Sequence, residues 1–269
     1  MTHTFEPEGH RTLSITQILR GGAWRVESMR ALSRPRLIWF TKGQGRITVS
    51  GVTRGYGANN VVFVPANTMH GFEASRLVQG TIVEFPQNAG LGFGGTLPED
   101  PVHLRLRDVA HQGEFSTLMD RFQSELSQNL PGRQAAVAAH GALLLVWLNR
   151  MIGGAADDPL PSGSSKRIAV AYSALVERDF AAGRSVAAFA ADLGVTPTHL
   201  SRACKAASGR PAHALLNDRV MAEAYLLLSE TRRPIREISE ALGFSSAAYF
   251  TRAFQKHTGK TPSEFRRTA

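Results

Sequence analysis

One recurring stretch decides the fold of this chain: Leu200-Ser201-Arg202-Ala203-Cys204-Lys205 followed by Gly209-Arg210-Pro211. Fifty residues later it returns as Phe250-Thr251-Arg252-Ala253-Phe254-Gln255 followed by Gly259-Lys260-Thr261-Pro262. A repeat at a fixed offset indicates two copies of one structural unit. Before each copy, two apolar residues precede a glycine, namely Phe189 and Leu193 before Gly194, and Ile238 and Leu242 before Gly243. Each copy therefore predicts a helix, a tight glycine turn and a second helix that crosses the first.

The start of each second helix has a capping residue, and its outer face has an arginine. Thr196 can cap the first copy with Pro197 in the first turn, and Ser245 can do the same in the second copy. Arg202 and Arg252 occupy equivalent exposed positions. The helix expected between the copies, residues 211–229, would span roughly 28 Å. Because successive major grooves on one side of DNA lie about 34 Å apart, one chain could place both second helices in adjacent grooves. The alternative is a helical bundle with a coincidental repeat.

These motifs resemble the AraC/XylS family of transcription regulators over about residues 166–268. The resemblance is carried by Gly194-Val195-Thr196-Pro197-Thr198-His199-Leu200-Ser201-Arg202, Arg219, Leu227-Leu228, Ile235, Ile238, Gly243-Phe244-Ser245, Tyr249-Phe250-Thr251-Arg252-Ala253-Phe254, Gly259-Lys260-Thr261-Pro262 and Phe265-Arg266. It implies a double helix-turn-helix domain that binds double-stranded promoter DNA, with RNA polymerase as a further partner if the protein is an activator.

In that family the exposed face of each second helix contacts base edges. The matching residues here are Thr198, Ser201, Arg202, Ala247, Ala248, Tyr249 and Arg252. Ala247 and Ala248 offer only methyl contacts, for example to thymine, so the second copy is expected to act mainly as a backbone clamp. Phosphate contacts are expected from Thr196, Lys205, Lys256, Lys260 and Arg266.

The distribution of charge agrees with a DNA-binding part at the C-terminus. The 269-residue chain has a formal net charge of +9. Residues 166–269 contain 16 basic and 9 acidic side chains, a net of +7, whereas residues 1–165 are near neutral. Such asymmetry indicates a polyanion-binding module beside a near-neutral one.

The first 110 residues predict an antiparallel sandwich or barrel. Short apolar and β-branched runs between residues 11 and 86 are separated by glycine turns such as Lys42-Gly43-Gln44-Gly45. Pro65-Ala66-Asn67-Thr68-Met69-His70 resembles the second motif of cupin barrels, with Asn67 in place of its glycine. Arg34-Pro35-Arg36-Leu37-Ile38-Trp39 stands where the first cupin motif would supply metal-ligating histidines. We therefore expect no metal and no cofactor.

The expected fold class is a two-domain α+β chain: a cupin-like antiparallel β-barrel with two helices, then an all-α double helix-turn-helix. The expected boundaries are 1–110 for the barrel, 111–153 for the helices, 154–165 for a flexible linker and 166–269 for the DNA-binding domain. In the barrel, we expect a small organic effector, a carboxylic acid by its chemistry, to meet Arg36, Trp39, Phe63, His70 and Glu84. For His70, a rim position satisfied by the backbone is the alternative.

A homodimer is the expected assembly, through an apolar stripe of the helix at 133–152. Its residues are Val137, Leu144, Leu148 and Met151. The alternative is that this helix packs on its own barrel. Cys204 matches Phe254 in the repeat, so it is expected to lie in the core.

Other features limit the compartment and the chemistry. One cysteine excludes an intrachain disulfide, and the polar, acidic Met1–Glu8 does not predict a signal peptide. The most apolar window, residues 135–148, is too short to span a bilayer, so we expect a cytoplasmic protein with no membrane partner. The second function considered is a cupin-type enzyme, an isomerase or dioxygenase, with a helical tail. Without the first-motif ligands no catalytic residue is expected.

Overall fold

The computed structural model describes residues 9–75, 77–90, 94–154, 156–158 and 163–268. Its N-terminal part consists of two antiparallel sheets with two short helices at their edge. The elements are β1 (Arg11–Ser14), α1 (Ile15–Arg20), α2 (Trp24–Glu27), β2 (Arg36–Lys42), β3 (Gly45–Val49), β4 (Val52–Tyr56), β5 (Asn60–Val64), β6 (His70–Phe72), β7 (Gln79–Glu84) and β8 (Val102–Arg105).

The five-stranded sheet has the order β1-β7-β2-β5-β8, and the three-stranded sheet has the order β4-β3-β6. Apolar side chains that include Ile38, Phe40 and Val62 fill one core with Ile47 and Phe72 of the smaller sheet. The expected cupin-like sheet fold is confirmed as two facing sheets. Asn67 adopts the left-handed backbone expected for it, with a φ of 55°.

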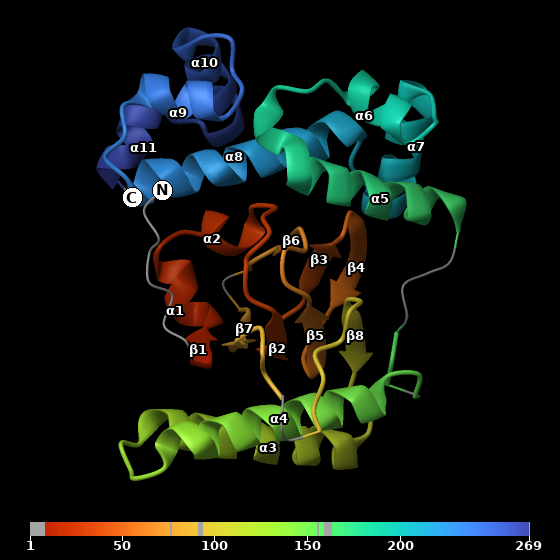
Figure 1. Ribbon diagram of the computed structural model, residues 1–269, viewed down its shortest axis with the longest axis vertical. Coiled ribbons are helices and arrows are strands. Elements are labelled where there is room, and N and C mark those ends of the chain that lie inside the picture. The colour runs from red at the N-terminus through yellow and green to blue at the C-terminus, as the bar shows by residue number, and fades with distance from the viewer. Residues whose placement is uncertain (1–8, 76, 91–93, 155, 159–162, 269) are drawn as a thin grey trace.

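A second core covers the other face of the larger sheet. Two helices pack there, α3 (Val109–Ser127) and α4 (Arg133–Met151), which lie along the lower edge of the molecule in Figure 1. Leu37 and Phe63 of the sheet contact Phe115 and Leu144 of the helices within this core. The larger sheet is therefore buried on both faces.

The remaining chain is helical and lies across the opposite side of the sheets (Figure 1). Its helices are α5 (Ser164–Asp179), a 3₁₀ turn (Phe180–Ala182), α6 (Val186–Asp192), α7 (Pro197–Ser208), α8 (Ala212–Glu230), α9 (Ile235–Ala241), α10 (Ala247–Thr258) and α11 (Pro262–Thr268). The pairs α6–α7 and α9–α10 are the two helix-turn-helix units, joined by α8. The all-α double helix-turn-helix expected from the repeat is confirmed.

The loop that leads into the first unit also touches the turn of the second unit, backbone to backbone. Gly243, in the turn of the second unit, lies so close to Gly183 that an added Cβ on it would come within 2.5 Å of the Gly183 nitrogen. Both glycines have positive φ, 65° at Gly183 and 75° at Gly243. A side chain at either position would be strained by its backbone and would meet the other loop.

Contacts at both ends of α8 join the C-terminal helices to the N-terminal part. Val52 of β4 packs in one apolar cluster with Tyr172 of α5 and Leu200 of α7. The Thr53 hydroxyl donates to the Ser208 carbonyl over 3.1 Å. At the other end of α8, the Trp24 ring of α2 stacks on Tyr225 with centroids 5.1 Å apart.

The stretch expected to be a flexible linker is partly fixed to the sheets. Residues 155 and 159–162 of that stretch lie outside the described residues, as do residues 1–8. Asp157 forms a backbone bridge to Leu104. The Asp158 carboxylate forms ion pairs with Arg54 and Arg105. The composition of the linker could not reveal these two residues as anchors, because acidic residues are also typical of solvated linkers.

Candidate nucleic-acid interface and ligand cavity

Both second helices begin with a side-chain cap. The Thr196 hydroxyl accepts the backbone N–H of His199 over 3.2 Å, as the sequence predicted. In the second unit the capping residue is Ser246, which accepts the Tyr249 N–H over 3.2 Å, and not Ser245. The reason is that the second turn contains one more residue between its glycine and its cap. Each cap satisfies one of the free N–H groups at the helix start.

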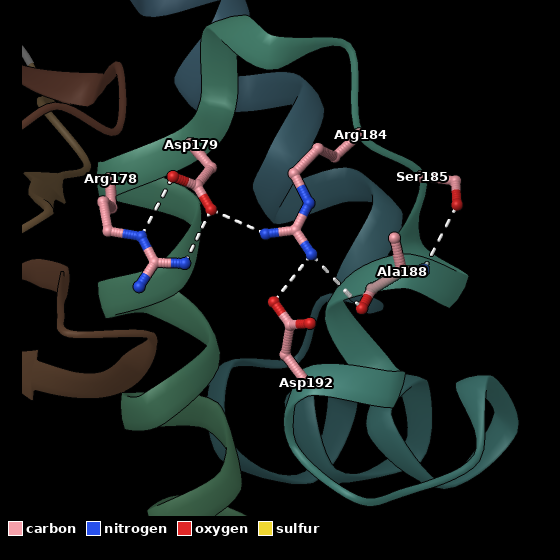
Figure 2. Close-up of polar contacts among 6 residues, drawn as sticks. All are labelled: Arg178, Asp179, Arg184, Ser185, Ala188 and Asp192. Atoms are coloured by element: carbon pink, nitrogen blue, oxygen red, sulfur yellow. Dashed lines mark hydrogen bonds and ion pairs between the residues drawn. The ribbon is translucent and has the colours of Figure 1, made fainter.

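Polar contacts hold the first helix of the first unit in place (Figure 2). Arg184 joins the end of α5 to α6, because it pairs with Asp179 and with Asp192, at 2.6 Å in each case. Arg178 also pairs with Asp179 over 2.8 Å. The Ser185 hydroxyl caps α6 by accepting the Ala188 N–H. These arginines are therefore already neutralised within the protein.

The arginines of the two second helices differ from Arg178 and Arg184 in their pairing. Arg202 on α7 and Arg252 on α10 are exposed. Within the part of the chain that the structure describes, neither side chain makes a hydrogen bond or an ion pair. A planar, five-donor guanidinium that has no internal partner is free to donate to a base edge or a phosphate.

The other base-edge candidates share the outer faces of the same helices. Thr198 is exposed beside the half-buried Ser201 on α7. On α10, Ala248 and Tyr249 are exposed, and Ala247 is half-buried. Tyr249 keeps 53% of its surface exposed, which is unusual for an aromatic side chain.

The phosphate candidates do not form one group. Lys205, Lys256 and Lys260 are exposed, whereas the Thr196 hydroxyl serves as the cap. Arg266 corrects our expectation, because its half-buried guanidinium donates to the Arg233 carbonyl over 2.6 Å. That bond fixes α11 to the loop before α9, so Arg266 is primarily a structural tie.

A cavity of 420 Å³ lies between the two sheets and the α1–α2 segment. Its polar lining comes from Arg25, Arg30, Arg36 and His70, and its apolar walls include Ile38. Burial lowers the pKa of His70 to about 3, so the ring is neutral at pH 7. Its Nδ1 lies 2.8 Å from the Thr68 carbonyl, which supplies a backbone partner. The cavity therefore has three cationic groups and a neutral imidazole.

Arg36 is the most deeply placed of the three arginines. It pairs with Glu84, its neighbour in register on β7. Burial lowers the pKa of Arg36, whereas its ion pair with Glu84 favours the charged form. Burial also lowers the pKa of Arg30, to about 10, so Arg30 stays protonated at neutral pH. The Arg36 Nε is buried without a hydrogen-bond partner among the described residues. An unsatisfied donor beside a cavity favours an anionic ligand.

Three of the five residues expected in the cavity do not line it. Glu84 is one of them and is joined to the cavity only through its ion pair with Arg36. Trp39 and Phe63 face α3 and α4, where the Trp39 ring lies 5.3 Å from Phe115. Alternation along β2 explains the error, because residues 36 and 39 project from opposite faces of a strand. Arg25 and Arg30 were missed because no sequence pattern shows that α2 and the bridge between Arg30 and His70 lie over the sheets.

The expected dimer stripe is also corrected. Val137, Leu144, Leu148 and Met151 are buried in the core between α4 and the larger sheet of their own chain. These side chains are therefore not available to a second chain. The face of α4 that remains outside includes Leu143, which is 48% exposed.

The structure also bears on metals and membranes. Among the described residues, no group of three or more His, Cys, Asp or Glu side chains could hold a metal ion. None of the described helices is long and apolar enough to cross a bilayer. Cys204 is buried in the core, as its repeat position predicted.

The arrangement is that of a double helix-turn-helix DNA-binding domain beside a double-sheet domain, and comparison with known proteins agrees. Residues 189–268 match the family model described as a helix-turn-helix domain. The arabinose operon regulatory protein of Escherichia coli (strain K12) is 30% identical over 159 residues, 59% of this chain and 53% of that protein. The Msm operon regulatory protein of Streptococcus mutans is 20% identical over 85% of this chain and 82% of its own length.

Among solved structures, ToxT from Vibrio cholerae O395 aligns over 97% of this chain and 98% of that chain, with a TM-score of 0.43 and 13% identity. The chain spans about half the length of the arabinose regulators it matches. The matched relatives are operon regulatory proteins, and the C-terminal helices of this chain are similar to a helix-turn-helix domain over residues 189–268.

Proposed function

We propose that this protein is a sequence-specific transcription regulator that reads promoter DNA with α7 and α10. The observation that supports this most strongly is the pair of exposed arginines without internal partners, Arg202 and Arg252, at equivalent places on two capped helices. Such a regulator acts on DNA in the cytoplasm and needs no catalytic residue. Whether it activates with RNA polymerase or represses depends on the promoter.

The test is selection of bound sequences from a random duplex library by the parent chain and by Arg202→Ala. If Arg202 reads a base edge, its loss costs about 1–3 kcal/mol and relaxes preference at one position. The matched control is Lys256→Ala, which should weaken binding to all sequences equally. It should also lower the slope of log K against log salt concentration by about 1. A parent chain that enriches no sequence would refute the proposal.

The cavity supports a second part of the proposal, a small organic acid as effector. Its 420 Å³ suits a ligand of that size, and Arg25, Arg30 and Arg36 supply cations for a carboxylate. Thermal-shift screening of aliphatic and aromatic acids, followed by calorimetry, tests this. Arg30→Gln should remove binding, whereas Arg20→Gln, an exposed arginine of α1 outside the cavity, should not. Equal loss of acid binding in both variants would exclude the cavity as the binding site.

A homodimer remains part of the proposal, now through the outer face of α4. Ala136, Ala139, Leu143, Val146 and Arg150 follow one another at spacings of three and four residues and lie outside the core. This spacing is that of a coiled-coil seam, for which a second copy of α4 is the matching partner. Leu143→Arg should then sediment as a folded monomer. Unchanged sedimentation would place the dimer contact elsewhere.

A further inference from the structure

A polar groove of 620 Å³ runs between α8 and α10. One wall comes from α10 through Arg252, Lys256 and His257. The other comes from Arg210 and the first half of α8, through His213, Asn217 and Asp218. None of the α8-side residues was expected to contact DNA.

The groove carries an excess of positive charge. Arg210, Arg252 and Lys256 face a single carboxylate, that of Asp218. Two imidazoles add further hydrogen-bonding groups, and His257 Nδ1 lies 3.3 Å from the Asn217 side-chain nitrogen. Burial and the charge of Arg210 lower the pKa of His257. The chemistry of the walls suits a phosphate rather than an apolar ligand.

The position of the groove connects it to the reading face. Tyr249 and Arg252 line the groove and also belong to the exposed face of α10. Lys256 follows Arg252 one helical turn later on the same side. If α10 enters a major groove through Arg252, the backbone at the edge of that groove passes over Lys256 and toward α8.

Asp218 controls how Arg210 is presented. The carboxylate is only 6% exposed, and Arg210 Nη2 donates to its Oδ1 over 2.8 Å. Burial raises the pKa of Asp218 to about 6 despite this ion pair. The pair holds Arg210 at the side of the groove, but it also occupies donors that a phosphate would need and places a negative charge next to it.

On the basis of the proposed function, we propose that this groove binds a phosphodiester of the DNA backbone beside the major groove read by α10. Arg210 and Lys256 are its cationic contacts, and Asp218 is a built-in competitor for Arg210 that weakens binding. The α8 helix is then part of the DNA interface and not only a connector between the two units.

The test is fluorescence anisotropy of a labelled, mixed-sequence 30-base-pair duplex with the full chain at several salt concentrations. The variants are Arg210→Gln, Asp218→Asn and the two combined. The charge-matched control is Arg121→Gln, at an exposed arginine of α3. Helix α3 lies at the opposite end of the molecule from α10 (Figure 1). Arg210→Lys, which keeps the charge, should retain the parent slope of log K against log salt. If Arg210→Gln unfolds the chain, Asp218→Asn in the parent and in the Arg210→Lys background carries the test.

Loss of one phosphate contact lowers the slope of log K against log salt by about 0.9 and weakens binding about eightfold at 0.1 M salt. We expect this of Arg210→Gln but not of Arg121→Gln. Asp218→Asn should tighten binding severalfold, and this gain should vanish when Arg210 is also changed. A merely structural ion pair would not produce that dependence.

Equal slopes for Arg210→Gln and Arg121→Gln, or an Asp218→Asn gain that survives without Arg210, would overturn the groove assignment. So would loss of inorganic phosphate binding in Arg210→Gln with an unchanged duplex slope, because the groove would then serve a free anion. A parent chain that binds no duplex overturns the proposed function as well, which distinguishes the two failures.

Discussion

The two helix-turn-helix units share one sequence pattern but attach to the sheets differently. The first unit rests on β4 through an extended apolar cluster that includes Val52 and Leu200, with a hydrogen bond from Thr53. The second has the aromatic contact of Trp24, whose ring stacks on Tyr225 and meets the edge of Phe265 at 5.7 Å. Trp24 belongs to α2, whose Arg25 lines the ligand cavity. A change in the cavity is therefore expected to act on the second unit first.

The largest expected effect is the loss of folding stability in acid. It should destabilise the sheets, which support both helix-turn-helix units. Burial lowers the folded-state pKa of His70 to about 3 and of His103 to about 4. The unfolded chain therefore binds more protons below pH 6.5, and folding stability falls as the pH falls. The loss is about 1.4 kcal/mol per histidine for each pH unit between about 6.5 and 4.

Hydrogen exchange at pH 7 and pH 5 measures this acid effect region by region. The sheets should lose protection before the helices, because both of these histidines lie in strands. The raised pKa of Asp218 in α8 works in the opposite direction, since its folded form takes up a proton first. Equal loss of protection in sheets and helices would contradict the expected difference in acid sensitivity between the two regions.

The next prediction compares how much the core of each unit contributes to stability. Phe254 and Cys204 occupy equivalent, fully buried positions in the repeat. Phe254→Ala should cost about 3–5 kcal/mol through the cavity it leaves, whereas Cys204→Ala removes one atom and should cost on the order of 1 kcal/mol. Urea unfolding of both variants measures the difference. Similar costs would mean that the second core collapses around the missing ring.

A smaller effect tests the aromatic contact directly. Trp24→Ala removes two ring contacts worth about 0.5–1.5 kcal/mol each beyond their buried area. Hydrogen exchange should then rise in the last turns of α8 and in α11, with α6 and α7 unchanged. Thr53→Ala is the matched change at the first unit, and it should affect α7 alone. If Trp24→Ala loosened both units equally, the attachments would not be independent.

The smallest effect compares the two caps. Ser246→Ala and Thr196→Ala each remove one hydrogen bond at a helix start and should cost about 1 kcal/mol. Thr196→Ala should cost less, because Pro197 already restricts the first turn of α7. Thermal unfolding of the two variants measures this. A larger loss at Thr196 would show that proline does not compensate.

The repeat predicted the helical part well because each signal there had a local cause. Glycine turns, a proline at a helix start and the burial of Cys204 opposite Phe254 depend on near neighbours in the chain. The Ser245 cap was wrong by one residue, since the length of a turn depends on how two helices meet. Thr261 and Glu264, three residues apart, form a reciprocal capping box, which is a local signal of the same kind.

The sheets and the cavity were harder to predict because the larger sheet is buried on both faces. Alternation places Ile38 and Trp39 on opposite sides, but both sides are apolar, so the pattern does not identify the inner one. A similar ambiguity explains α4, where the neighbouring Leu143 and Leu144 are both apolar but only Leu144 lies in the core. Arg30 enters the cavity from an isolated β-bridge with His70, and only the folded chain brings it beside Arg36.

The close approach of Gly183 and Gly243 has a consequence for the binding site on DNA. Because the two loops touch without intervening side chains, the angle and distance between α7 and α10 cannot adjust freely. One added base pair rotates a half-site by about 34° around the helix axis, since a turn takes about 10.5 base pairs. The number of bases between the two half-sites in a target promoter is therefore as much a part of its recognition as the identity of those bases.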